Sequence, residues 1–181
     1  MNYPPENLPA IPAELIQQVS AFLRLDHGQD DLDVARLLRS AAQLCENFIG
    51  ALLLVRSIVE QVKARTEWQP LRRAPVQAIT QIGGLDAQGE SIILPAVSYA
   101  IDIDSNGIGW VKFDHIPDAE KITVTYTAGL ASNWDALPSD LYHGVVRMAG
   151  YLYTHRDRAD LGGPPLAVTA LWRPHRRMRL S

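Results

Sequence analysis

The chain has 181 residues, of which 47% are hydrophobic and 20% are charged, so it is long enough to build one ordinary globular core. Its single cysteine, Cys45, excludes an internal disulfide and any zinc site that is built from several cysteines. The sequence has no apolar run of about 18 residues or more and no hydrophobic segment typical of a signal peptide near its start. We therefore expect a soluble protein that is made in a cytoplasm and does not enter a membrane.

The formal net charge of −3 is unevenly distributed along the chain. Residues 158–181 contain five of the 17 basic residues but only one of the 20 acidic residues, so an acidic body is followed by a basic end. Such an asymmetry is typical of a terminal segment that contacts a nucleic acid or an acidic protein surface.

The first part of the chain is predicted to be helical after an extended start. Four prolines within residues 1–12 favour an extended lead-in. The spacing of apolar residues then predicts a short helix from Pro12 to about Leu25 and a second helix at residues 30–50, which opens with acidic residues. Cys45 lies on the apolar face of the second helix, and we interpret it as a core residue.

The middle of the chain predicts an antiparallel sheet of local meanders. Residues 51–64 fit either a continued helix or a strand, and we favour the strand. Five further runs of β-branched and aromatic residues are separated by turn residues and predict strands. These runs are Val76–Ile82, Ser91–Leu94, Tyr99–Ile103, Gly109–Phe113 and Ile122–Tyr126. Asn106 and Gly107, between the third and fourth runs, predict a hairpin.

Pro138 opens a long predicted helix, which extends to about Arg156. Helices, strands and a further helix in this order predict an α+β fold. We expect the N-terminal helix pair and the long C-terminal helix to pack together, with an antiparallel β meander inserted between them and an extended basic C-terminal tail.

These elements suggest a division of the chain into three parts. They are an extended lead-in at 1–12, a single α+β domain at 13–157 with a β-rich insert at about 52–127, and a linker and tail at 158–181. The tail contains candidate anchors for a partner, because its apolar residues can fill a pocket and its arginines can pair with carboxylates or phosphates. The anchors are Leu171, Trp172, Arg173, Arg176, Arg177 and Arg179.

The sequence contains no pattern that is typical of catalysis. It has no phosphate loop, dinucleotide-binding glycine motif, nucleophile elbow or zincin helix, and its five histidines lack the spacing of metal ligands. Asp102 and Asp104 share one strand face, and we interpret them as a solvated edge that discourages aggregation. We therefore expect no catalytic residues, no metal and no cofactor.

Several segments follow the order of one known family. They are SAAQLCENFIG at residues 40–50, RRAPVQAITQI at 72–82, SYAIDIDSNGIGWV at 98–111 and, most specifically, the segment at 122–157 that begins ITVTYTAGL. With these segments, the chain resembles the head-to-tail connector, or adaptor, proteins of long-tailed phages and gene transfer agents. The closing ALWRPHRRMRL at 170–180 is similar to the tail of the gene-transfer-agent-like branch.

This resemblance implies a non-enzymatic virion protein at the head-tail junction, made in the bacterial cytoplasm. Many copies would form a ring, a dodecamer, between the portal protein and a downstream tail component such as a stopper or tail terminator. DNA would pass through the lumen without sequence-specific binding, and the six tail anchors named above would contact the portal. An acidic body suits such a channel, because cations that bind phosphates would hold the DNA.

Two other interpretations remain open. In one, the protein is a DNA-binding packaging or accessory protein that uses its basic C-terminal tail. In the other, the tail is a solvated end of a small globular domain with an unrelated purpose. A salt titration of DNA binding distinguishes them, because four arginines on phosphates would make the affinity fall steeply with salt.

Overall fold

A computed structural model describes the chain at residues 8–25, 30–85, 91–115, 121–156 and 163–177. The chain forms two compact units, a β unit at Leu54–Ser132 and a helical unit at Leu8–Leu53 and Asn133–Ser181. The β unit covers most of the predicted β-rich insert at about 52–127. None of the helices within the described residues is long and apolar enough to cross a membrane.

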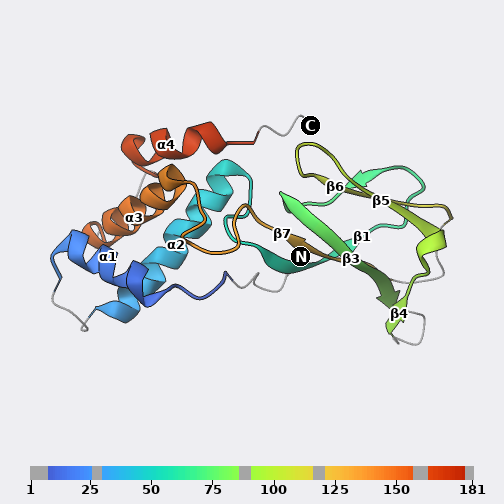
Figure 1. Cartoon of the computed structure of the whole chain (residues 1–181), viewed down its shortest axis with the longest axis horizontal. Helices are drawn as coiled ribbons and strands as arrows, with labels where there is room; N and C mark the ends of the chain where they lie inside the picture. Colours follow the sequence, from blue (N-terminus) through green and yellow to red (C-terminus); the bar gives the residue numbers. More distant parts are fainter. Residues whose placement is uncertain (1–7, 26–29, 86–90, 116–120, 157–162, 178–181) are drawn as a thin grey trace. The chain divides into compact units, whose positions relative to one another are not determined.

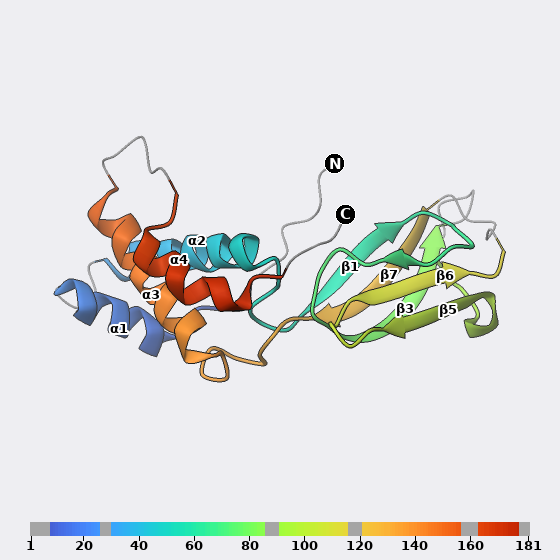
Figure 2. The ribbon, with the colours of Figure 1, turned by 90° about the horizontal axis from the view of Figure 1, so that it is seen from above.

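In the described part of the helical unit there are four α-helices (Figure 1). They are α1 (Ala13–Leu23), α2 (Asp31–Ile49), α3 (Ser139–Thr154) and α4 (Leu166–Trp172), and α4 continues into the short 3-10 helix η2 (Arg173–His175). Helices α2 and α3 pack against each other, and both α1 and α4 contact this pair (Figure 2). The predicted packing of the N-terminal helices on the long C-terminal helix is therefore seen in the helical unit.

The apolar spacing of the sequence explains the helical core. Val34, Leu38 and Cys45 on α2 are fully buried, and Leu141 and Val145 on α3 are buried as well. Complete burial of one such aliphatic side chain contributes about 1.5–3 kcal/mol. The interpretation of Cys45 as a core residue is thus confirmed.

The strands that the structure describes in the β unit form two antiparallel sheets. The first has the strand order β1-β7-β3-β4 and the second has the order β2-β6-β5. The strands are β1 (Arg56–Val62), β2 (Gln69–Pro70), β3 (Val76–Leu85), β4 (Ser91–Ile93), β5 (Tyr99–Ile103), β6 (Gly109–Phe113) and β7 (Lys121–Ala128), with a 3-10 helix η1 (Ala96–Ser98) before β5.

A partly buried hydrogen-bond network links β1 and β7 to residues 72 and 73 after β2. The Tyr126 hydroxyl donates to Glu60 Oε2 at 2.7 Å and accepts from the Arg73 amide at 3.2 Å. The Arg72 amide also donates to Glu60 Oε2, at 3.0 Å. These partners allow the Glu60 carboxylate to be buried, because a buried charge without hydrogen bonds would be strongly destabilising.

The sheet differs from the predicted series of local meanders. Strand β7, the last strand, pairs with both β1 and β3, so two of the strand contacts join segments that are far apart in the sequence. Strand β3 also continues through Gly83 and Gly84 to Leu85, whereas the predicted run ended at Ile82. Glycine is required there because a Cβ built at Gly83 would lie 2.5 Å from the Ile92 carbonyl oxygen on β4.

The prediction of an extended C-terminal tail is wrong for the described residues. Residues 166–175 fold into α4 and η2, and α4 packs against α2 and α3. The physical reason is Trp172, whose large apolar ring is fully buried in the helical unit. Arg179 and residues 1–7 of the predicted lead-in lie outside the described residues.

Candidate functional site

The C-terminal segment, residues 163–177, contains five of the six predicted anchors. Its best-defined contact is the packing of Trp172, whose ring centroid lies 5.8 Å from that of Phe48 on α2. On α3, a Cβ built at Gly144 would lie 2.7 Å from Trp172 Cδ1 and closer still to Nε1. Gly144 therefore creates the slot that receives the indole.

The slot fits Trp172 by shape rather than by polar pairing. The indole Nε1 is buried and has no hydrogen-bond partner within the described part of the chain. An unpaired buried donor opposes folding by about 1–3 kcal/mol, and the burial of the large ring must outweigh this effect. Trp172 is thus an internal anchor that holds the C-terminal segment on its own helical unit.

Polar contacts fix the end of the C-terminal segment. The His175 Nε2 atom lies 2.6 Å from Asp140 Oδ2 in the first turn of α3, and the Arg177 amide donates to the Ile49 carbonyl at 2.8 Å. Partial burial would raise the pKa of the Asp140 carboxyl, but hydrogen bonds from His175 and from the Leu141 amide outweigh it. The pKa of Asp140 is therefore below its ordinary value.

The arginines of the C-terminal segment differ in their surroundings. Arg173 and Arg176 are exposed, and the Arg176 guanidinium lies 5.8 Å from the centroid of the Phe48 ring. Arg177 is half-buried, and its Nη1 atom has no hydrogen-bond partner among the described residues. Leu171 is half-buried. The exposed positive charge of the segment thus comes from Arg173 and Arg176, and contact of the six anchors with a partner stays a prediction.

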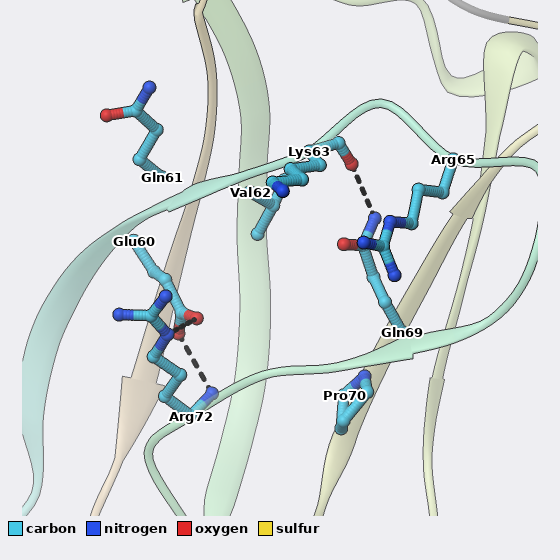
Figure 3. A pocket seen from close by; sticks show the side chains of 8 residues that line it. All are labelled: Glu60, Gln61, Val62, Lys63, Arg65, Gln69, Pro70 and Arg72. Carbon is cyan, nitrogen blue, oxygen red and sulfur yellow. Dashed lines mark hydrogen bonds and ion pairs between the residues drawn. The ribbon is translucent and has the colours of Figure 1, made fainter.

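A second feature is an open pocket of about 230 Å³ in the β unit (Figure 3). It is lined by Glu60, Gln61, Val62, Lys63, Arg65, Gln69, Pro70 and Arg72. The Gln69 side-chain amide donates to the Lys63 carbonyl at 2.6 Å, which ties β2 to the chain after β1. Lys63 and Arg65 expose their side chains at the rim. Apart from Val62 and Pro70, the lining residues are polar or charged.

The carboxylate of Asp104 has a role that the sequence analysis missed. Its Oδ1 atom accepts from the amides of Asn106 and Ile108, both at 2.9 Å, and its Oδ2 atom accepts from Trp110 Nε1 at 3.2 Å. Asp104 therefore stabilises the β5-β6 hairpin and is not a solvated edge charge. An aspartate just before Asn-Gly is the signal that could have revealed it, because such side chains bond the backbone of a turn.

No family model and no curated protein matches the sequence. Solved structures do match it over nearly its whole length. One is described as the neck of an empty GTA particle computed with C6 symmetry, with 25% identity, a TM-score of 0.77 and coverage of 100% of this chain and 95% of the other. A second, from the virion of a native gene transfer agent (GTA) particle, has 24% identity, a TM-score of 0.71 and the same coverage. A third, the neck of a native GTA particle computed with C12 symmetry, has 24% identity, a TM-score of 0.70 and coverage of 97% of each chain.

Proposed function

Because the chain belongs to the gene-transfer-agent-like family of head-to-tail connector proteins, we propose that it is a structural protein of the virion neck that joins the head to the tail. The observation that carries this proposal is the similarity of the complete chain, with both its units, to chains of solved particle necks. A local likeness of one sheet or one helix pair would not support it.

In this proposal, identical copies form a ring through which DNA passes. The solved necks are described with C6 and C12 symmetry, which supports a ring and agrees with the dodecamer that the resemblance implies. The net charge of −3 also suits a DNA channel. An acidic ring binds phosphates weakly, and the passing DNA is therefore not held by the channel.

We further propose that the ring binds the portal protein through the C-terminal segment and a downstream tail component, a stopper or tail terminator, on its other side. Arg173 and Arg176 are the described anchors that expose their guanidinium groups, which can pair with carboxylates of the portal. Trp172 acts indirectly here, because its ring holds the segment on α2 and α3.

Co-sedimentation with purified portal rings tests this assignment. The wild-type chain should sediment with the portal, and a variant with both Arg173→Glu and Arg176→Glu should lose about tenfold or more in affinity, because it opposes like charges at the contact. Arg147→Glu, at an exposed position of α3, is the matched control and should bind like the wild type. If the double variant binds as well as the control, the C-terminal segment is not the portal contact.

A second candidate function rests on the same exposed arginines, which could instead bind DNA phosphates as in a packaging or accessory protein. Each phosphate contact that forms should add about 0.9 to the slope of log affinity against log salt. Binding of duplex DNA with a steep salt dependence that Arg173→Glu and Arg176→Glu abolish would favour this alternative. Absence of such binding, together with portal binding, would favour the connector.

A further inference from the structure

The β unit has two edges of opposite character. Glu60 on β1 accepts from the amide of Arg72, two residues after the end of β2, so β1 and β2 form the same edge of the unit. In the second sheet, with the order β2-β6-β5, strand β5 therefore lies at the opposite edge (Figure 2). We call the first the pocket edge, because it carries the open pocket, and the second the β5 edge.

The β5 edge presents unpaired backbone groups. The Asp104 amide donates to the Ile108 carbonyl, and the Asp114 amide donates to the Ser98 carbonyl. Asp104 and Ser98 therefore belong to hydrogen-bonded pairs, which alternate with non-hydrogen-bonded pairs along an antiparallel ladder. The backbone N–H and C=O groups of Tyr99, Ile101 and Ile103 then point away from β6. No described residue pairs with these outward groups, so β5 is an open edge strand.

The β5 edge also exposes aliphatic side chains that would normally be buried in a core. Ile101 pairs with the fully buried Val111 and lies on the same face of the sheet, yet it is 45% exposed. Ile103 is 39% exposed, and Val97 on η1, directly before β5, is 85% exposed. Proteins cover or protect an open strand with exposed aliphatic side chains, since it otherwise promotes aggregation.

Exposed charges make the two edges complementary. Asp102 is exposed on β5, whereas Lys63 and Arg65 are exposed at the pocket edge. Within the described residues, neither Lys63 nor Arg65 forms an ion pair with a carboxylate. The pocket volume of about 230 Å³ also leaves room for one aliphatic side chain.

We propose that the β5 edge of one copy docks onto the pocket edge of the next copy. This inference rests on the proposed ring and names its contact surfaces. A heterologous contact uses two different surfaces of each copy and closes into a ring when the rotation permits. Here an aliphatic side chain of the β5 edge enters the pocket, while Asp102 faces Lys63 and Arg65.

Engineered cysteines test the contact, because the natural Cys45 is buried and its burial raises the pKa of its thiol, which makes it unreactive. Chains with Ile101→Cys are mixed with chains with Lys63→Cys, assembled with portal rings and oxidised. The contact predicts disulfide-linked dimers in the mixture and none with either variant alone. Leu32→Cys, at an exposed position of α2 in the helical unit, replaces Lys63→Cys in the control mixture, which should give no dimers.

The outcomes separate this inference from the proposed function. If the wild-type chain joins the portal and forms a ring, but the mixture gives no more dimers than the control, the ring exists and the named edges are wrong. Dimers of Ile101→Cys with itself would mean a two-fold contact and would also overturn the inference. If the wild-type chain neither binds the portal nor forms a ring, the connector function fails, and the inference fails with it.

A charge exchange provides an independent readout. Asp102→Lys and Lys63→Asp should each raise the protein concentration needed for ring formation by about tenfold, because each places like charges opposite one another. Both changes in one chain should restore most of the wild-type value. If the double variant is as defective as the sum of the single variants, the two residues do not face each other.

Discussion

Trp172 illustrates how one residue can decide the behaviour of a terminal segment. Its sequence context, a short apolar run between prolines and arginines, suggested an exposed anchor for a partner. The structure instead buries it completely against Phe48 and Gly144. The sequence could not reveal this contact. A glycine within a helix indicates only that the helix is less stable there, and it does not identify which side chain packs against it.

Trp172→Ala should lower the free energy of unfolding by about 3–5 kcal/mol, as expected for the loss of a fully buried tryptophan. Gly144→Ala should lower it by about 1–3 kcal/mol, because the new methyl group overpacks the slot. Urea unfolding measures both changes. Arg147→Ala is the exposed control on the same helix, and a Trp172→Ala effect as small as that of this control would contradict the buried position.

Asp140 should give the helical unit a measurable dependence on pH. Because its pKa is lowered by folding, its contribution is present above the ordinary carboxyl value of 3.8 and is lost as the pH falls through the lower folded value. Asp140→Asn should therefore reduce the stability at pH 7, by up to about 1 kcal/mol for this partly exposed pair, and have little effect near pH 2. An equal loss at both pH values, measured by urea unfolding, would mean that the charge of Asp140 is not responsible.

Among the elements, the sequence predicted local structure better than pairing. Strands β5 and β6 have the predicted bounds, because Asn106 and Gly107 mark the hairpin between them. The pairing of β7 with both β1 and β3 was not predictable. A cross-strand pair such as Ile58 with Tyr126 cannot be recognised from the sequence of either segment alone. Helix α4 was missed because its seven residues are too few for a helical period to stand out.

Because α4 packs on the helical unit, removal of the C-terminal segment should destabilise the fold. A chain that ends at residue 162 lacks Val168 and Trp172, which are both buried in the helical unit. We therefore expect truncation to expose Phe48 and Gly144. It should also lower the midpoint of thermal unfolding by at least about 10 °C, because a loss of about 1 kcal/mol in the free energy of unfolding lowers the midpoint by about 2–8 °C. Circular dichroism measures this midpoint. An unchanged midpoint would mean that the C-terminal segment does not contribute to the stability of the fold.

For the whole molecule, the sequence supported a family and a general role, but not the surfaces of assembly. The basic end and the α+β order were visible in the sequence, whereas the β5 edge and the pocket edge arise only when distant strands are paired. A ring requires two complementary surfaces on every copy, and their positions depend on the tertiary fold.

The central claim is that this chain forms a ring that joins the neck of a particle. The most direct measurement is electron microscopy of portal rings from the same genome after incubation with the purified wild-type chain, with the mass of the complex determined in parallel. The account predicts an added ring with rotational symmetry at one end of the portal, and a mass increase that corresponds to a whole number of copies around that axis. Portal rings that remain unchanged in image and mass, beside a chain that stays monomeric, would contradict it.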